Sequence, residues 1–98
     1  MLEKTVESYL KKHVKALGGK YFKWKSPQHN GVPDRIVMVY NQTWFVELKK
    51  PKGDTRRLQT IVGTMIKEHT DNYCILESID EIDNFIKLVK ERNVRETT

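Results

Sequence analysis

Two short apolar runs on either side of a polar turn constrain the fold of this chain most. Residues 34–40 are rich in β-branched side chains, and residues 44–49 form a second apolar run. The polar residues 41–43 between them suit a tight turn, so the runs are predicted to pair as an antiparallel hairpin of largely buried strands. Counting outward from that turn places Asp34 opposite residues 48–50, at the open end of the hairpin.

Periodicity along the rest of the chain predicts three helices and two further strands. The expected helices cover residues 2–17, 54–69 and 78–89, and the expected strands cover residues 20–25 and 72–76. Polar residues from Arg92 onward are expected to form a frayed tail. The order α-β-β-β-α-β-α predicts an α/β fold, with a small mixed sheet flanked by helices. Residues 1–98 are expected to form a single domain.

Local signals mark the ends of these helices. Gly18-Gly19 should end the first helix, and Asp54 can cap the second. Ser78 and Glu81 have the spacing of a capping box at the start of the third. The second helix is expected to turn one apolar face toward the sheet, made of Leu58, Ile61, Val62, Met65, Ile66 and His69.

The composition is that of a folded chain without a membrane segment. Hydrophobic residues make up 38% of the sequence, and no apolar stretch approaches the ~20 residues needed to span a bilayer. The N-terminus lacks the apolar core of a signal peptide. Cys74 lies in an apolar run and is predicted to be a reduced, buried thiol. A soluble cytoplasmic protein, of a bacterium or a phage-infected host cell, is therefore expected.

Charge is distributed unevenly along the chain. The net charge of +5 favours a polyanionic partner such as nucleic acid. Most Lys and Arg residues lie between Lys11 and Arg57, where Asp34, Glu47 and Asp54 are the only carboxylates. A basic region that contains isolated carboxylates is typical of a site that binds phosphate together with a metal ion.

Glu47 and Lys49 are the polar residues of an otherwise apolar strand. Residues two apart on a strand share a face, so both should project from the face opposite Trp44, Val46 and Leu48. An ordinary ion pair on an exposed sheet face is one interpretation, since chance alone predicts about one Glu-x-Lys pattern in a chain of this composition.

Asp34 favours a second interpretation, although an Asp at the start of a strand often only accepts backbone hydrogen bonds. At the mouth of the hairpin it would converge with Glu47 beside a lysine. Two carboxylates and a strand carbonyl form a hard-oxygen site of the kind that Mg²⁺ accepts. The hairpin therefore predicts a candidate metal site.

The motifs of the chain resemble those of the PD-(D/E)XK nuclease superfamily. Glu7, Gly31-Val32-Pro33-Asp34, Glu47-Leu48-Lys49 and Gln59 occur in the order and element types of that superfamily. The sequence is most similar to its virus-type replication-repair nuclease (VRR-NUC) branch, in a stand-alone, phage-like form. The resemblance spans nearly the whole chain and implies a restriction-endonuclease-like core that hydrolyses DNA with Mg²⁺ or Mn²⁺.

The resemblance also implies roles for individual residues. Asp34, Glu47 and the Leu48 backbone carbonyl would bind the metal, and Glu7 would act on it through a water. Glu3 is the alternative to Glu7, because both lie on one side of the first helix.

Two further residues complete the catalytic set that the resemblance implies. Lys49 would orient or help deprotonate the attacking water and stabilise the charged phosphate. Gln59, from the second helix, would position that water or Lys49. Contacts with DNA are expected from basic and polar residues near the site in sequence, namely Lys23, Lys25, Ser26, His29, Lys50, Lys52, Arg56 and Arg57. A solubilising basic face is the other interpretation of these residues.

A structure-selective DNA endonuclease is the function that these expectations indicate. Stand-alone members of the resembled branch are similar to homodimeric Holliday-junction resolvases, which implies a homodimer that cuts branched DNA. The alternatives are a nuclease for flaps or nicked duplex and a non-catalytic, basic nucleic-acid-binding module. No nucleotide cofactor is expected, because residues 50–53 lack the Gly-Lys-Ser/Thr of a phosphate-binding loop.

Overall fold

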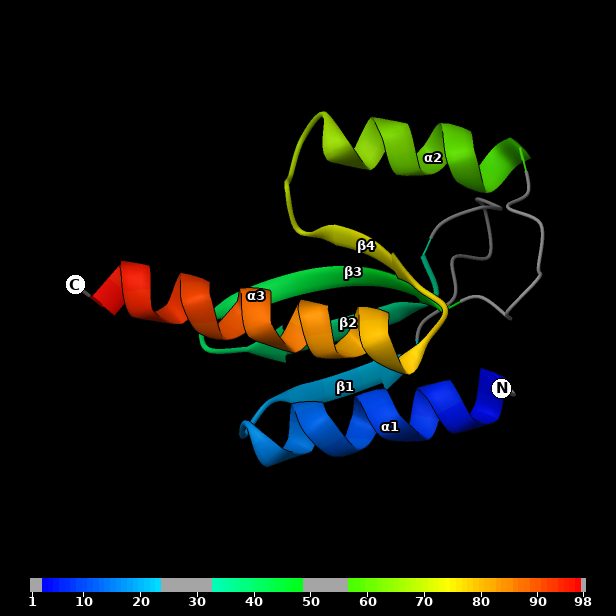
Figure 1. The fold of residues 1–98 in the computed structure, drawn as a ribbon. Helices are drawn as coiled ribbons and strands as arrows, with labels where there is room; N and C mark the ends of the chain where they lie inside the picture. The colour runs from blue at the N-terminus through cyan, green and yellow to red at the C-terminus, as the bar shows by residue number, and fades with distance from the viewer. Residues whose placement is uncertain (1–2, 24–32, 49–56, 98) are drawn as a thin grey trace.

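The computed structural model describes residues 3–23, 33–48 and 57–97, which form one mixed sheet and three helices (Figure 1). Along the chain these are α1 (Glu3–Ala16), β1 (Lys20–Lys23), β2 (Arg35–Val39), β3 (Gln42–Leu48), α2 (Arg57–Lys67), β4 (Tyr73–Leu76) and α3 (Ile79–Thr97). The predicted order of elements is therefore confirmed.

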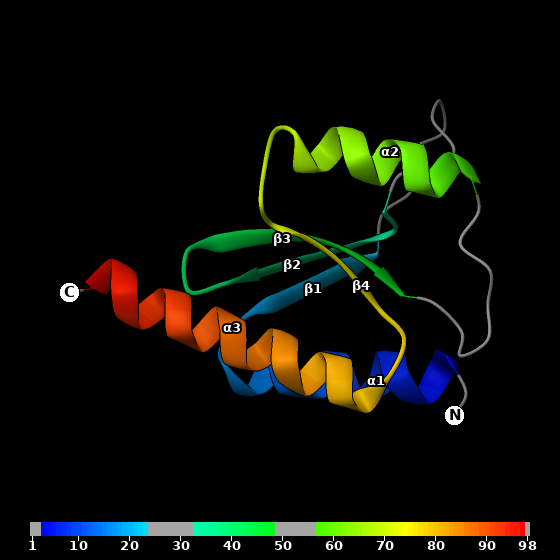
Figure 2. The same ribbon diagram turned by 45° about the horizontal axis from the view of Figure 1, so that its top comes forward.

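The strands lie in the order β1-β2-β3-β4, and the molecule has three layers. Strand β2 pairs antiparallel with both β1 and β3, whereas β4 runs parallel to β3. Helices α1 and α3 cover one face of the sheet, and α2 lies on the other (Figure 2). The main core lies between the sheet and the α1–α3 layer, and it includes Val6, Val37, Trp44, Val46 and Ile82.

The hairpin of β2 and β3 turns one residue earlier than the sequence predicted. Tyr40 and Asn41 have φ angles of 50° and 62°, as a two-residue hairpin turn of the I′ type requires. Val39 consequently pairs with Gln42, and Arg35 pairs with Val46. The next step outward sets Asp34 opposite Glu47, so the predicted partner of Asp34, residues 48–50, is wrong.

A Schellman motif ends α1, as the two glycines predicted. Gly18 has a φ of 79°, and its N–H donates to the Lys15 carbonyl over 2.9 Å. The Gly19 N–H donates to the Val14 carbonyl, also over 2.9 Å. A side chain at Gly19 would meet the Met38 carbonyl oxygen at 2.8 Å, so α1 can approach the sheet this closely only because residue 19 is glycine.

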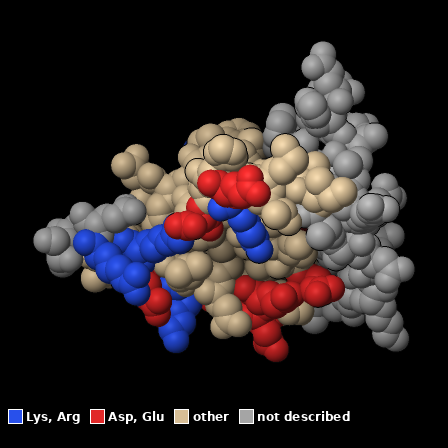
Figure 3. All heavy atoms as spheres, turned by 90° about the horizontal axis from the view of Figure 1, so that it is seen from above, with Lys and Arg blue, Asp and Glu red and all other residues tan. Residues whose placement is uncertain are grey.

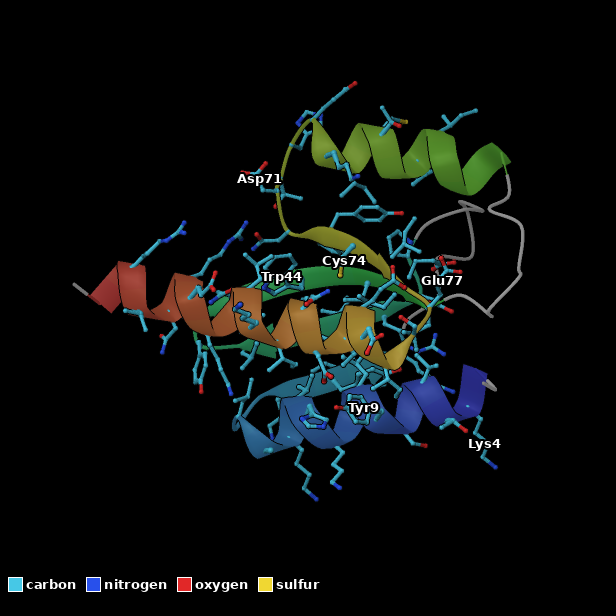
Figure 4. The ribbon with its side chains drawn as sticks, in the orientation of Figure 1. Lys4, Tyr9, Trp44, Asp71, Cys74 and Glu77 are labelled. Atoms are coloured by element: carbon cyan, nitrogen blue, oxygen red, sulfur yellow. The ribbon has the colours of Figure 1, made fainter. Side chains whose placement is uncertain are left out.

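Helix α3 extends to Thr97, so the prediction of a frayed tail from Arg92 is wrong. The Arg92 guanidinium lies 4.7 Å from the centre of the Trp44 ring, and its Nη1 donates to the Asn72 side chain. Figure 4 labels Trp44 on the sheet beneath α3, where its ring meets Phe85 edge to face at 5.1 Å. These contacts stabilise the last turns of the helix.

The start of α3 has the predicted capping box. The Glu81 N–H donates to Ser78 Oγ over 3.2 Å, and Glu81 Oε1 accepts from the Glu77 N–H over 2.9 Å. Acidic side chains lie toward the start of this helix and basic ones toward its end (Figure 3), an arrangement that complements the helix dipole.

Helix α2 buries less of its apolar stripe than expected. Ile61 and Met65 are 48% and 57% exposed, whereas Val62 and Ile66 are half-buried against the sheet. The predicted cap Asp54 lies outside the described residues. Among the helices of the described ranges, none is both long and apolar enough to cross a bilayer.

Candidate active site

One end of the sheet brings three carboxylates into a single connected cluster. The start of β2, the end of β3 and the first turns of α1 lie at this end (Figure 1). The Asp34 N–H donates to Glu47 Oε2 over 3.3 Å, which joins the two strands of the hairpin. Arg35 then connects Asp34 to Glu7 on α1. Glu7, Asp34 and Glu47 therefore belong to one cluster, and their binding of a metal stays a prediction.

Glu47 is buried at the end of β3, on the face of the sheet that carries α2. Trp44, Val46 and Leu48 point to the opposite face and into the main core, as the alternation predicted. Glu47 is only 6% exposed. Burial raises the pKa of the Tyr73 hydroxyl, and the nearby Glu47 charge raises it further. A buried carboxylate at this position does not fit the interpretation of an exposed surface ion pair.

The two carboxylate oxygens of Asp34 have different surroundings. Oδ2 lies 2.5 Å from Arg35 Nη1, in an ion pair. Oδ1 is buried and has no hydrogen-bond partner among the residues that the structure describes. A buried carboxylate oxygen without a donor is costly, and a cation would satisfy it. Asp34 Oδ1 is thus the atom that best fits a metal ligand.

The donors at this end of the sheet suit a hard cation bound partly by water or phosphate. Within the described ranges, no group of three His, Cys, Asp or Glu side chains could hold a metal ion. Asp34 and Glu47 supply two carboxylates, and the Leu48 carbonyl would be the third protein oxygen. Mg²⁺ is commonly held by one or two carboxylates, with waters and substrate phosphate as its other ligands. The residues present therefore fit such an ion.

Glu7 is a paired carboxylate at the edge of the main core. Its Oε2 accepts hydrogen bonds from Tyr21 Oη at 2.8 Å and from Arg35 Nε at 2.9 Å. Lys23 Nζ lies 3.7 Å away on an exposed side chain. Partial burial raises the pKa of Glu7, but these hydrogen bonds and the charges of Arg35 and Lys23 outweigh it and hold the pKa below its usual value. Glu7 is therefore a stable anion in this fold.

Arg35 is the site residue that sequence reasoning missed. It occupies an inward-facing position of β2, two residues before Val37, and it is 8% exposed. A cation at a core-facing position requires a buried anion as its partner. The alternation of inward positions along β2 was the signal that could have identified it.

Several predicted site residues lie outside the described residues or are described only in part. Lys49, Lys25, Ser26, His29, Lys50, Lys52 and Arg56 belong to the first group. Gln59 and Arg57 are placed in the first turn of α2, and Glu3 in the first turn of α1, by their backbone alone. The convergence of Lys49 and Gln59 on the carboxylates thus stays a prediction.

Comparison with known proteins agrees with the fold. No protein-family model matches the chain. A solved structure of a "VRR_NUC domain" superposes with a TM-score of 0.79 at 26% identity, over 87% of this chain and 94% of the other. "Putative nuclease p44" of Acyrthosiphon pisum secondary endosymbiont phage 1 is 42% identical over 50 residues, and the chain spans about half the length of that relative, 54%. The predicted resemblance to VRR-NUC domains is confirmed.

Proposed function

We propose that this chain, whose fold is that of a VRR-NUC domain, is a metal-dependent DNA endonuclease that hydrolyses phosphodiester bonds. The observation that carries the proposal is Asp34 Oδ1 beside Glu47, a buried oxygen with no hydrogen-bond partner among the described residues. The similarity to a VRR_NUC domain and to a phage protein named as a nuclease supports it.

The proposed metal is Mg²⁺ or Mn²⁺. Asp34, Glu47 and the Leu48 carbonyl would hold it, and Glu7 would act through a water, with Glu3 as the alternative acid on α1. When bound, the ion would supply Lewis-acid stabilisation of the charged phosphate. A carboxylate already ionised at neutral pH needs no proton release before it binds, and the lowered pKa of Glu7 is consistent with that role.

The remaining chemistry would fall to Lys49 and Gln59. Lys49 would orient the attacking water, accept or pass on its proton and stabilise the negative charge on the phosphate. Gln59 would hold that water or the Lys49 ammonium in position. In-line attack on the phosphorus would leave a 5′-phosphate on the product.

The proposed substrate is branched DNA, such as a Holliday junction, cut by a homodimer. The resemblance to stand-alone resolvases supports both the branched substrate and the homodimer. A symmetric pair of subunits is suited to reading the shape of a symmetric junction. Basic residues near the site in sequence, among them the exposed Lys23, would contact DNA phosphates.

A non-catalytic nucleic-acid-binding module is the second candidate. The observation that favours it is the pairing of Glu7 and Asp34 with Arg35, which would suit a purely structural cluster. Against it, carboxylates near a bound polyanion repel the phosphates unless a metal intervenes.

Cleavage of labelled DNA distinguishes these candidates. The substrates are a four-way junction, a flap and a nicked duplex, each incubated with Mg²⁺ or Mn²⁺. We expect the wild type to cut the junction, and Asp34→Asn to cut it at least about 100-fold more slowly, because it loses a metal ligand. Asp71→Asn, at an exposed position labelled in Figure 4, is the matched control and should retain full activity.

Each alternative has its own outcome. Equal cutting by Asp34→Asn would contradict the proposed active site. Junction binding without cutting by the wild type would favour the binding module. Faster cutting of flaps or nicked duplex would keep the chemistry and replace the proposed substrate.

A further inference from the structure

Arg35 links the carboxylates of the proposed metal site to α1. Nη1 lies 2.5 Å from Asp34 Oδ2, and Nη2 lies 2.7 Å from Glu7 Oε2. The side chains of Arg35 and Glu7 are 10% and 17% exposed, so water screens their ion pair only weakly. The Asp34 side chain is 45% exposed, and its ion pair with Arg35 is partly screened. One guanidinium therefore holds an oxygen of each of two carboxylates that come from different elements.

Further hydrogen bonds determine the orientation of this guanidinium. Nε donates to Glu7 Oε2 at 2.9 Å and lies 2.5 Å from Tyr21 Oη. Nη1 also donates to the Asp34 carbonyl at 3.2 Å. A planar fork with five N–H donors can make these contacts together, whereas a lysine ammonium on a flexible stem cannot.

We propose that Arg35 is a positioning residue for the metal site, which holds Asp34 by Oδ2 and thereby presents the buried Oδ1 to the cation. Tyr21 supports the same arrangement from β1, since its hydroxyl donates to Glu7 and contacts Arg35 Nε. This inference rests on the proposed function, because it concerns the same metal site.

Charge repulsion and the positioning role predict opposite changes in metal affinity when Arg35 is replaced. The direction of the measured change therefore tests the inference. A guanidinium close to a bound divalent cation repels it, so removing the charge alone should tighten metal binding. If Arg35 positions Asp34, removing it should weaken metal binding despite the loss of repulsion. Outer-shell partners of metal ligands typically contribute 10- to 100-fold to metal affinity.

Titration of the DNA-free protein with Mn²⁺, followed by calorimetry, measures this affinity without reference to activity. We expect Arg35→Gln to bind Mn²⁺ about 10- to 100-fold more weakly than the wild type. Lys4→Gln is the matched control, because it removes one positive charge from an exposed side chain one turn before Glu7 on α1. Its Mn²⁺ affinity should equal or slightly exceed that of the wild type.

Tyr21→Phe keeps the charge and the ring of the wild type and removes only the hydroxyl. It therefore tests the positioning role of Arg35 if Arg35→Gln fails to fold. We expect its Mn²⁺ binding to weaken about threefold to tenfold, since the hydrogen bonds of the hydroxyl to Glu7 and to Arg35 are both lost. Thermal unfolding of each variant shows whether the fold is retained.

The outcomes separate this inference from the proposed function. Equal or tighter Mn²⁺ binding by a folded Arg35→Gln, or unchanged binding by Tyr21→Phe where Arg35→Gln does not fold, would overturn the positioning role and leave the proposed nuclease intact. If the wild type itself binds no Mn²⁺ in calorimetry and cuts no DNA, the proposed function fails first.

Discussion

Replacing Glu7 by glutamine should destabilise the protein through the buried cation that Glu7 neutralises. Glutamine has nearly the same shape, and its amide oxygen can still accept a hydrogen bond. The substitution removes the negative charge beside the Arg35 guanidinium, whose Nη2 lies 2.7 Å from Glu7 Oε2. Asp34 would then be the remaining anion in contact with Arg35 among the described residues.

The magnitude follows from the burial of the pair. Removing one partner of a fully buried ion pair costs about 3–5 kcal/mol, and a hydrogen bond to a charged group contributes about 1.5–3 kcal/mol. The Glu7 side chain is 17% exposed, and glutamine keeps part of the hydrogen bonding, so the lower range applies. We expect the free energy of unfolding to fall by about 2 kcal/mol at pH 7, and the melting temperature by about 10 °C.

The effect should depend on pH in a defined direction. Because hydrogen bonds and nearby cations hold the pKa of Glu7 below its usual value, the ionised form stabilises the fold. This stabilisation is fully present above the ordinary glutamate pKa of about 4.3 and is lost as pH falls through the lower, folded-state pKa. The difference between wild type and Glu7→Gln should therefore shrink from pH 7 to pH 3.

Urea denaturation followed by tryptophan fluorescence measures this difference, since Trp44 is buried in the core. Glu68→Gln, at an exposed position, is the control and should change the free energy of unfolding by less than about 0.5 kcal/mol. A Glu7→Gln variant as stable as the wild type at pH 7, or a difference that grows on acidification, would refute the reasoning.

Three further predictions test the packing of the fold. Gly19→Ala would place a methyl group 2.8 Å from the Met38 carbonyl oxygen, so urea denaturation should show a loss of about 2 kcal/mol. Arg92→Ala removes the cation above the Trp44 ring and should lower stability by about 1–2 kcal/mol in the same assay, whereas an unchanged urea midpoint would contradict a stabilising contact between Arg92 and Trp44. Burial raises the pKa of the Cys74 thiol to about 12, so its reaction with a disulfide reagent at pH 8 should be on the order of 1000-fold slower in the native than in the urea-unfolded protein.

Much of the fold could be predicted because its signals are local. The three helices and the sheet strands follow from apolar periodicity, and the Gly18 and Ser78 caps follow from backbone chemistry within a few residues. The extent of α3 could not be predicted in this way. Its last turns are stabilised by the contact of Arg92 with Trp44, a residue far away in the sequence.

The register of the hairpin shows the limit of local reasoning. The turn residues Tyr40 and Asn41 were misplaced by one, because the positive φ angles of a turn are not visible in the alternation of the strands. This one-residue shift of the turn decides whether Asp34 lies opposite Glu47 or opposite residues 48–50.

By itself, the sequence determined the order of elements, the inward face of β3 and the candidate carboxylates Glu7, Asp34 and Glu47, because period and residue type are local properties. Only the tertiary structure decided how those carboxylates are partnered. Arg35 meets Glu7 across 28 residues and so joins α1 to the hairpin. The physical reason is burial: a guanidinium removed from water must be paired, and no local pattern specifies which distant anion pairs with it.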